Sequence, residues 1–325
     1  MLSDRLIEHI LTALPGRRVG LIGDLFLDRY LDLDPALTEP SVETGLDAYQ
    51  VVRVRSYPGA LGTVVNNLAA LGVGEIRPVA FIGDDGEGYE LRQALANLPA
   101  VRTGAVFDAA GVRTPTYCKP MLGGSELNRL DIKNRARTPA AAEAAVLEHL
   151  DRLWPDVDAL LVLDQVSEAD CGVITARVRD RIRDLSEHDP ARFVLADSRE
   201  RIHEFRSVCV KPNAREAGAF PGGPAAFARA VGRHVFLTRG EQGIELVAPD
   251  GAAHTIPAYP VTGPTDIVGA GDSTSAGIAC AVAAGASFAE AAAFGNLVAS
   301  ITIQQLGVTG TATPAQVRGR WHEVK

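Results

Sequence analysis

The segment Thr265–Gly285, TDIVGAGDSTSAGIACAVAAG, combines residue types that can bind an anion and accept a proton. Gly269, Ala270 and Gly271 carry little or no side chain, so their backbone N–H groups can approach a ligand closely. The apolar run that follows predicts a helix, whose N-terminus presents free N–H groups and the positive end of the helix dipole. Asp272 stands directly after them and could take a proton from an attacking hydroxyl group. The spacing predicts an anion hole with a base beside it; the alternative is a glycine-rich turn with Asp272 as the helix N-cap.

If the anion is a phosphoryl group in transfer, these donors would meet the negative charge that develops on it. Other phosphate-binding motifs are missing from the sequence. There is no G-x-x-x-x-G-K-[ST], no H-R-D or D-F-G pair, and the first strand continues as GLIGDL instead of G-x-G-x-x-G. The sequence therefore excludes a Walker-type nucleotide site and a protein kinase, and it disfavours a dinucleotide-binding protein.

The composition limits the class of protein. The chain has 325 residues, of which 46% are hydrophobic and 22% charged, values typical of a globular protein with a sizeable core. A net charge of −8 argues against nucleic acid or an anionic membrane as a partner. No signal peptide and no membrane-spanning apolar run is visible. We expect a reducing, cytoplasmic location, because the four cysteines lie far apart without C-x-x-C spacing: Cys118, Cys171, Cys209 and Cys280.

Hydrophobic periodicity predicts an α/β protein. The apolar run Arg18–Asp24 predicts a buried parallel strand, and residues 51–57 alternate as in a half-exposed strand. Helices are expected at 140–153, at 169–186 and, as two long helices, between Gly271 and about Gln305. Because these helices alternate with apolar strands, we expect a parallel sheet covered on both faces.

A second β-sheet is expected within the same domain, which we take to span residues 1–325. The segments 33–57 and 113–131 read as strands but stand apart from the regular alternation of strands and helices. We assign both segments to this small sheet.

Five motifs occur in a characteristic order: GD…LDRY, PGALGTVVNNLAALG, KPNAREA, TRGEQG and DIVGAGD. In this order they resemble the ribokinase or PfkB family of carbohydrate kinases, over residues 17–310. Within the family, GDLFLDRY, Thr38–Val42, Asn128–Asp131 and TRGEQG resemble most the bacterial D-glycero-D-manno-heptose-7-phosphate kinases of lipopolysaccharide-precursor synthesis, kinase domain only. The chain stops at Lys325, so we expect no fused second activity.

The resemblance implies a ribokinase-like three-layer α/β/α sandwich with a mostly parallel central sheet and a small β-sheet lid. It also implies transfer of the γ-phosphoryl group of MgATP to a hydroxyl group of a sugar or sugar phosphate. Asp272 would be the catalytic base, and the N–H groups of Gly269, Ala270 and Gly271 would form the anion hole. Asp266 matches a position that can hold a monovalent cation such as K⁺.

On the nucleotide side, the resemblance assigns Asn213 and Glu216 to the N-x-x-E motif, which helps organise Mg²⁺ and the nucleotide phosphates through water. A hard cation that keeps its waters needs few protein oxygens, which suits this pair. The alternative for Glu216 is a first-turn carboxylate stabilised by the helix dipole. Three further residues match the loop along the nucleotide and one matches a position near the adenine: Thr238, Gly240 and Gly243, and Asn296, respectively.

On the sugar side, Asp28 matches an aspartate that hydrogen-bonds substrate hydroxyls, with an ion pair to Arg29 or Arg53 as the alternative. Gly59 matches the first glycine of the family's GGAAN signature. Arg129 and Asp131 lie in the expected lid and could contact a phosphate or a hydroxyl; the alternative is that Arg129 is solvated.

Two more carboxylates, Asp164 and Asp197, end parallel strands at the edge where α/β sheets place their sites, although loop capping would explain them equally. Their neighbours differ from the heptose kinases, because LDQ and DSR replace S-D-Y and D-P-K. The GGAAN signature also departs from the family, since Ala60 replaces the second glycine and Thr63 replaces the asparagine that contacts the sugar. The motifs for phosphoryl transfer therefore match the family, whereas the motifs that contact the acceptor are altered.

The departures leave three functions open. The first is a heptose-phosphate-type kinase, the second a kinase for another sugar or a nucleoside, and the third a non-catalytic homologue that binds nucleotides. A small-molecule sugar or sugar phosphate and ATP are the expected partners, together with a second copy of the chain paired through the lid.

Overall fold

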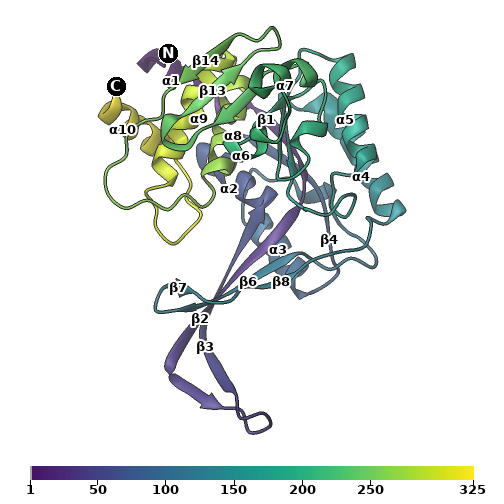
Figure 1. Ribbon diagram of the computed structural model, residues 1–325, viewed down its shortest axis with the longest axis vertical. Helices are drawn as coiled ribbons and strands as arrows, with labels where there is room; N and C mark the ends of the chain where they lie inside the picture. The colour runs from purple at the N-terminus through teal and green to yellow at the C-terminus, as the bar shows by residue number, and fades with distance from the viewer. Residues whose placement is uncertain (1) are drawn as a thin grey trace.

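The computed structural model describes residues 2–325 as three layers, with helices on both faces of a large sheet, and a second sheet that projects from them (Figure 1). The α/β/α sandwich expected from the sequence is thereby confirmed. The helices are α1 Asp4–Ala13, α2 Leu61–Leu71, α3 Gly86–Ala96, α4 Ala140–Leu153, α5 Ala176–His188, α6 Ala214–Gly218, α7 Gly223–Val231, α8 Ala270–Ala283, α9 Phe288–Thr302 and α10 Pro314–Val324.

The large sheet has nine strands in the order β14-β13-β12-β11-β10-β9-β1-β4-β5. All neighbours from β5 to β12 pair in parallel, and only the pairs β12–β13 and β13–β14 are antiparallel. Its strands are β1 Arg18–Gly23, β4 Glu75–Ile82, β5 Val106–Asp108, β9 Ala159–Asp164, β10 Phe193–Ser198, β11 Cys209–Val210, β12 Val235–Thr238, β13 Ile244–Val247 and β14 Ala253–Ile256.

Two apolar cores hold the layers together, because successive residues of a strand point to opposite faces. Along β9, Leu161 packs into the core formed with α1, α2, α8, α9 and α10, whereas Leu160 and Val162 pack into the core formed with α4, α5 and α7. The strands are thus buried on both faces, which is why they read as continuous apolar runs. Within residues 2–325, none of the helices combines the length and apolar character needed to cross a membrane.

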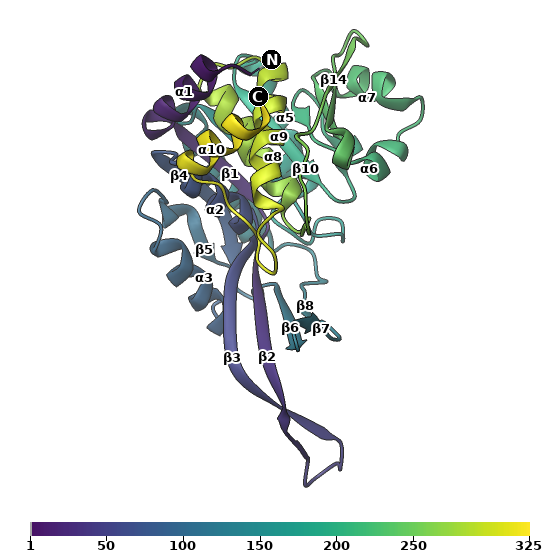
Figure 2. The same ribbon diagram turned by 90° about the vertical axis from the view of Figure 1, so that its left-hand side faces the viewer.

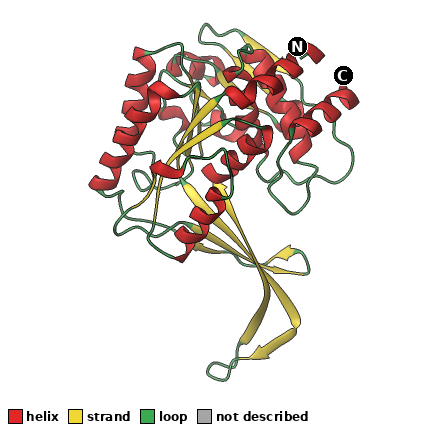
Figure 3. Ribbon diagram, turned by 180° about the vertical axis from the view of Figure 1, so that it is seen from behind, coloured by secondary structure: helices red, strands yellow, loops and turns green. Residues whose placement is uncertain are grey.

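The small sheet forms a long arm that leaves the sandwich at the carboxyl end of β1 (Figures 2 and 3). Its order is β3-β2-β6-β7, with β8 also paired to β6. The arm is longer than the expected segments 33–57 and 113–131, since it already begins at Leu25. Its strands are β2 Leu25–Pro40, β3 Asp47–Ala60, β6 Thr116–Leu122, β7 Ser125–Glu126 and β8 Leu130–Ile132.

The helix predictions hold with one correction. The helix expected at 140–153 is α4 with the same bounds, and the two helices expected after Gly271 are α8 and α9. The helix expected at 169–186 is wrong at its start, because α5 begins at Ala176 with Thr175 as its N-cap. Residues 169–175 form a loop because their backbone hydrogen bonds go to other segments, such as the bond from Thr138 N–H to the carbonyl of Asp170 (2.8 Å).

Candidate active site

The start of α8 lies at the carboxyl edge of the large sheet, where the body meets the arm. Gly269 is the N-cap, with φ +79°, and no side chain caps the helix. A Cβ on Gly269 would lie 2.5 Å from the Thr309 methyl carbon, so both the backbone conformation and the packing require glycine here. Asp272 is the third residue of the helix, so the alternative that it is the N-cap is wrong.

The backbone N–H groups at this helix start differ in how they are used. Ala270 N–H donates to the carbonyl of Ile267 (3.1 Å). Within residues 2–325, the N–H groups of Gly269, Gly271 and Asp272 have no backbone acceptor. Free donors of this kind at a helix N-terminus form an anion site. The geometry therefore favours Gly269 and Gly271 over Ala270 as donors of the predicted anion hole.

The Asp272 side chain is half-buried in a site that already holds another carboxylate. Burial, together with repulsion from Asp197, raises the pKa of Asp272 from its ordinary 3.8 to about 7, while the charges of Lys211 and Arg199 act in the opposite direction. A carboxylate with a pKa near neutrality is well suited to general-base chemistry, because it is largely ionised and still basic.

Lys211 places a positive charge against the same helix start. Its side chain is buried, and Nζ lies 2.8 Å from Oδ2 of Asp197. A Cβ on Gly271 would be 3.5 Å from this Nζ, so the ammonium group lies beside the free N–H groups of α8. Burial by itself lowers the pKa of Lys211, but the Asp197 carboxylate raises it above its ordinary value. The ammonium group therefore adds to the helix dipole in favouring an anion.

The predicted nucleotide-side residues line a cavity of about 380 Å³. Asn213 is the N-cap of α6, and it bridges to Thr238 at the end of β12. Gly240, with φ +58°, follows in the next turn. This volume falls within the range of small-molecule sites. The residues lining it are Asn213, Ala214, Arg215, Thr238, Arg239, Gly240 and Gln242.

Asn213 and Glu216 form a capping box, with both Glu216 oxygens accepting hydrogen bonds from Asn213 (2.7 and 2.8 Å). The alternative function of Glu216, a carboxylate in a helix first turn, is thus present in the structure. Burial and the nearby Asp197 raise the pKa of Glu216, so the carboxylates around Lys211 repel one another. That excess of negative charge suits a divalent cation.

The part of the chain that the structure describes holds no direct coordination site for such a cation. Among residues 2–325, no group of three or more His, Cys, Asp or Glu side chains has the arrangement of a metal site. A magnesium ion that keeps most of its waters and contacts Glu216 through them fits these residues.

Three other predicted residues lie outside this cavity and have structural contacts. A Cβ on Gly243 would be 2.1 Å from the carbonyl oxygen of Ile256, and φ there is +90°. Asn296 in α9 donates from Nδ2 to the carbonyls of Ile256 and Pro257 (3.1 and 3.0 Å). Asp266 accepts from the N–H groups of Val268 and Gly307 (3.0 and 3.1 Å). The predicted roles of Gly243 in the nucleotide loop, of Asn296 near the adenine and of Asp266 at a monovalent cation stay predictions.

On the acceptor side, Asp28 pairs with Lys119, whose Nζ lies 2.9 Å from Oδ1. The pairing with Arg29 or Arg53 that was considered from the sequence is wrong. A Cβ on Gly59 would lie 2.4 Å from Oδ2 of Asp28, so glycine is needed next to this carboxylate. Thr63, in the first turn of α2, is buried, and its methyl group would be 3.6 Å from a Cβ on Gly269. Thr63 thus joins the sugar-side motif to the predicted anion hole.

Arg129 and Asp131 form a bidentate pair on the arm (2.6 and 3.0 Å). The Arg129 guanidinium lies 4.3 Å from the centroid of the Tyr117 ring. Asp131 stands opposite Tyr117 in the β6–β8 register, and Tyr117 stands opposite Asp28 in the β2–β6 register. The arm therefore brings Asp28 and Asp131 onto the strands on either side of Tyr117, and Arg129 directly precedes β8. Arg129 is exposed to solvent, as the alternative expected, and is at the same time paired with Asp131 and stacked on Tyr117.

Sequence reasoning did not identify Lys211, Lys119 or Arg199 as site residues. Lys211 had a signal in the sequence, because it directly follows the apolar run SVCV, and a lysine buried at such a strand end needs a carboxylate partner. Lys119 and Arg199 depend on strand register and loop geometry, which the sequence alone does not give.

Comparisons with known proteins identify the family of this chain. The profile described as pfkB family carbohydrate kinase matches residues 33–316. Among curated relatives, the bifunctional protein HldE of Pelobacter propionicus is 30% identical and that of Trichlorobacter lovleyi 27% identical, each over 96% of this chain and 64% of the relative. The chain thus spans less than two thirds of the length of these relatives.

Solved structures share the fold at lower sequence identity. Arabidopsis thaliana ribokinase, complexed with ribose and ATP, has a TM-score of 0.69 at 17% identity, covering 94% of this chain and 98% of its own. The Methanocaldococcus jannaschii nucleoside kinase has a TM-score of 0.64 at 17% identity, with the same two coverages. The likeness shows a ribokinase fold, as the sequence predicted. Because the family profile matches most of the sequence, the chain belongs to the pfkB family of carbohydrate kinases, phosphotransferases that act on sugar hydroxyl groups.

Proposed function

We propose that this enzyme transfers the γ-phosphoryl group of ATP to a hydroxyl group of a sugar phosphate of the heptose-phosphate type. The observation that carries the proposal is Asp272, a carboxylate with a pKa of about 7 at the free N-terminus of α8, next to the Lys211 ammonium group. A base and an anion site at one point are what phosphoryl transfer to an alcohol requires.

In the proposed reaction, Asp272 accepts the proton of the acceptor hydroxyl as that oxygen bonds to the γ-phosphorus. The bond between the γ-phosphorus and the oxygen bridging to the β-phosphorus breaks, and ADP leaves with that electron pair. The N–H groups of Gly269 and Gly271 and the Lys211 ammonium group stabilise the negative charge on the transferred group. Asp28, on β2, orients the acceptor from the arm side.

The cavity at Asn213, Thr238 and Gly240 supports ATP as the donor, since it opens beside α6. A structure of a putative ribokinase II from E. coli, 15% identical with a TM-score of 0.67, contains ATP and Mg²⁺. Mg²⁺ would neutralise phosphate charge, held through water by Glu216. Arg239, whose guanidinium pairs with Glu245, borders the same cavity and adds positive charge there.

Similarity to the HldE proteins and the motifs GDLFLDRY and NRLD support a heptose phosphate as acceptor. Around Tyr117, the three cations Lys119, Arg129 and Lys133 meet, within residues 2–325, only the two carboxylates Asp28 and Asp131, and this excess of one positive charge also favours an acceptor that carries negative charge. A panel of heptose phosphates, hexose phosphates, free sugars and nucleosides, followed by ADP release, tests the acceptor. Turnover of nucleosides without turnover of sugar phosphates would overturn this part of the proposal.

The reaction itself is tested by Asp272→Asn. We expect kcat to fall by roughly 10²–10⁴-fold, because the variant lacks the proton acceptor. Nucleotide binding, measured by isothermal titration calorimetry, should persist because no nucleotide contact is removed. A variant that turns over like the unmodified enzyme would refute Asp272 as the base.

A kinase for another sugar or a nucleoside is the second candidate. It is motivated by Thr63, whose hydroxyl stands where the family has an amide with both a donor and an acceptor, and by the fold shared with a nucleoside kinase. The third candidate, a non-catalytic homologue, would require nucleotide binding with no transfer to any acceptor. Retention of Asp272 beside Lys211 argues against it, because binding alone needs no base.

We further propose that Asp266 and neighbouring carbonyls hold a monovalent cation such as K⁺. The Asp266 side chain joins the segment before α8 to Gly307, so a cation there would stabilise the approach to the anion hole. Activity that is the same in potassium and in tetramethylammonium buffers would overturn this assignment. The four free cysteines support a reducing cytoplasm as the place of action.

We also propose that the arm is a lid over the acceptor and the contact surface of a homodimer. Its β2–β3 hairpin exposes large apolar side chains, and β3 is an edge strand whose outer side pairs with no other strand within residues 2–325. Two strands alone are marginally stable in water, so a second copy that covers them would stabilise the arm. The exposed apolar residues are Leu37, Val42, Leu46, Tyr49, Val51, Val52, Val54 and Tyr57.

A further inference from the structure

Asp24 is a buried carboxylate with no part in the reaction described above. It is 3% exposed and is the one residue between β1 and β2. Its Oδ2 accepts hydrogen bonds from the N–H groups of Gln165 and Val166 (2.7 and 2.9 Å), and its Oδ1 accepts from Val173 N–H (2.8 Å). One side chain thus satisfies backbone donors at both ends of the segment 165–173.

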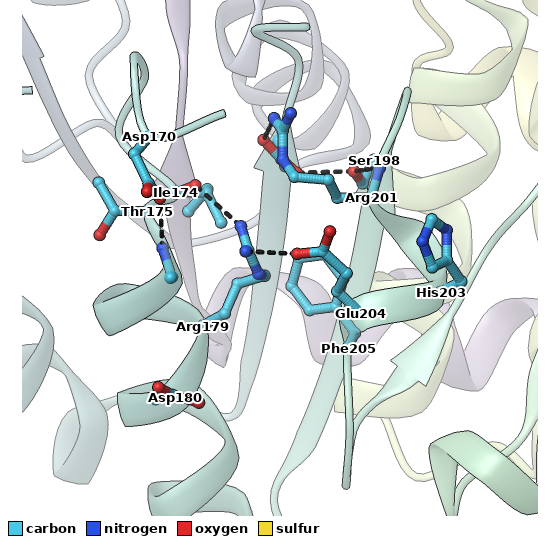
Figure 4. A network of polar contacts seen from close by, with 12 residues as sticks. Asp170, Ile174, Thr175, Arg179, Asp180, Ser198, Arg201, His203, Glu204 and Phe205 are labelled. Carbon is cyan, nitrogen blue, oxygen red and sulfur yellow. Dashed lines mark hydrogen bonds and ion pairs between the residues drawn. The ribbon is translucent and has the colours of Figure 1, made fainter. Parts of the chain in front are cut away.

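The same segment is held from its other side by Arg201. The Arg201 guanidinium donates to the carbonyls of Val166 and Ser167, the latter at 2.8 Å, and to Oδ1 of Asp164 (2.6 Å). Ser198 donates to the second oxygen of Asp164 (2.7 Å) and accepts from Arg201 N–H, at the end of β10 (Figure 4). Buried charges on both sides therefore fix the backbone of 165–173.

The segment bears one residue that reaches toward the site. The Gln165 side chain accepts a hydrogen bond from Arg199 Nε (2.9 Å). Arg199 is exposed, and within residues 2–325 no carboxylate forms an ion pair with it. Its positive charge lowers the pKa of both Asp272 and Tyr117, so the guanidinium is near enough to act on the base and on the arm.

We propose that Asp24 is a positioning residue for phosphoryl transfer: its carboxylate fixes the segment 165–173, so that Gln165 holds the Arg199 guanidinium near Asp272. The inference rests on the proposed function, because Asp24 would act through Asp272, the proposed base. Burial and the nearby Asp164 raise the pKa of Asp24 to about 6, which is still below the pKa of Asp272, about 7. At a pH where Asp272 is ionised, the Asp24 carboxylate is therefore ionised as well and accepts all three hydrogen bonds. With Arg199 in place, the pKa of Asp272 is lower than burial and Asp197 alone would make it.

Two variants test the connection at its two ends. Asp24→Asn keeps the shape but turns an NH₂ group toward a backbone N–H, so at least one of the three hydrogen bonds is lost. Gln165→Ala keeps the backbone segment and removes the acceptor for Arg199. In both variants Arg199 loses its fixed position, and we expect the apparent pKa in the profile of kcat/KM against pH to rise by roughly half a unit. Loss of the Asp24 charge alone would lower this pKa, so the direction separates the two effects.

The matched control is Asp170→Asn in the same segment. Asp170 Oδ1 accepts a hydrogen bond from Ala176 N–H (2.8 Å) at the start of α5 (Figure 4). Within residues 2–325, the one hydrogen bond of the Gln165 side chain is to Arg199 and does not involve Asp170. We expect the pH profile of this variant to match that of the unmodified enzyme. A shift of equal size in Asp170→Asn would mean that any disturbance of the segment acts on Asp272, and it would overturn the role of Asp24.

A second measurement does not depend on turnover. The difference in Tm between each variant and its Asp272→Asn counterpart, followed over pH, reports the pKa of Asp272 directly. An upward shift in Gln165→Ala and Asp24→Asn supports the inference. If Gln165→Ala folds and Asp272 keeps the pKa that it has in the unmodified enzyme, the inference is overturned, even where Asp24→Asn does not fold. If the enzyme phosphorylates no acceptor at all, the proposed function fails, while the Tm comparison still decides the role of Asp24.

Discussion

Around the start of α8, three carboxylates share one buried ammonium group. Asp197 forms the ion pair with Lys211, while Glu216 and Asp272 lie near enough to be affected by the same charges. The pKa of both Glu216 and Asp272 is raised, with burial as the largest cause. Asp197 therefore does two things: it keeps Lys211 charged, and it keeps Asp272 basic.

The raised pKa of Asp272 predicts how activity depends on pH. Because the base must be ionised, kcat/KM should be constant above about pH 7 and should fall about tenfold per pH unit below it. A profile recorded with saturating nucleotide from about pH 5 to 9 checks this. An activity that stays constant down to about pH 5 would mean that the transfer uses no base with this pKa.

The same shift predicts an effect on stability with a definite sign. Asp272 binds its proton more tightly in the folded than in the unfolded chain, so its favourable contribution is complete below about pH 3.8 and is lost as pH rises through about 7. Asp272→Asn should therefore exceed the unmodified protein in Tm at pH 8, with the difference shrinking toward pH 5. Scanning calorimetry at both pH values measures it, and a difference that grows on acidification would contradict the assignment.

Lys211 offers a test that separates chemistry from stability. Lys211→Met leaves the half-buried Asp197 carboxylate without its partner, which we expect to cost about 3 kcal/mol. The double variant Lys211→Met with Asp197→Asn removes both charges and should recover most of that stability without recovering activity. Urea denaturation and ADP release measure the two effects. A double variant with restored turnover would show that the ammonium group has only a structural role.

Among the helices and strands, the junction between β3 and α2 holds the most unusual backbone. Ala60 is the N-cap of α2, with φ 52° and ψ −116°. A residue with a Cβ rarely adopts this conformation, and it costs on the order of 1–3 kcal/mol. Leu61 N–H bonds to the carbonyl of Asp24 (3.0 Å), which holds the junction in place. The strain therefore lies where the arm returns to the body.

Ala60→Gly should relieve this strain. We expect the free energy of unfolding to rise by about 1 kcal/mol, since the gain in the folded state exceeds the added entropy of glycine in the unfolded chain. Chemical denaturation measures it, and Gly285→Ala, at φ +91°, is a control that should destabilise the protein. A less stable Ala60→Gly variant would indicate that the Ala60 methyl group makes favourable contacts that outweigh the strain.

The sequence predicts an element well where its signals are local. Helix α4 follows Pro139, and its apolar positions recur with helical spacing, so its bounds could be predicted to the residue. Residues 169–175 also have helical composition, but Asp24, distant in sequence, bonds to the N–H group of Val173. Such a tertiary contact leaves no local pattern, and the helix was therefore predicted to start too early.

The candidate site divides in the same way. The anion hole and base are contiguous from Gly269 to Asp272, so their spacing alone indicates chemistry. The Asp28–Lys119 pair requires the parallel register of β2 with β6, and the Lys211–Asp197 pair requires β10 beside β11. Register across a sheet is set by packing, which a single sequence does not reveal. The acceptor side was accordingly the less predictable half.

For the molecule as a whole, the apolar arm leads to a prediction about assembly. Val52 is 58% and Val54 is 56% exposed on the edge strand β3. If a second copy covers them, Val52→Asp with Val54→Asp should convert a dimer into a monomer, because two carboxylates would be buried in the contact. Size-exclusion chromatography with light scattering measures the mass.

Leu306→Asp, which changes an exposed apolar residue outside the arm, is the matched control and should leave the mass unchanged. An unmodified protein that is monomeric at all concentrations would rule out the dimer. A double variant that stays dimeric would place the contact elsewhere.

The passage from β1 to β2 determines how the arm can move. β1 ends at Gly23 and β2 begins at Leu25, so the chain passes from one sheet to the other through Asp24 alone. Asp24 is fixed to 165–173 on one side and, through its carbonyl, to Leu61 on the other. Rotation of the arm as a rigid body about a flexible hinge at Asp24 is therefore incompatible with this geometry. Closure over a sugar would have to occur by bending along the long strands β2 and β3. Amide hydrogens near Leu25 should therefore resist exchange during turnover, whereas those near the tip of the β2–β3 hairpin should exchange quickly.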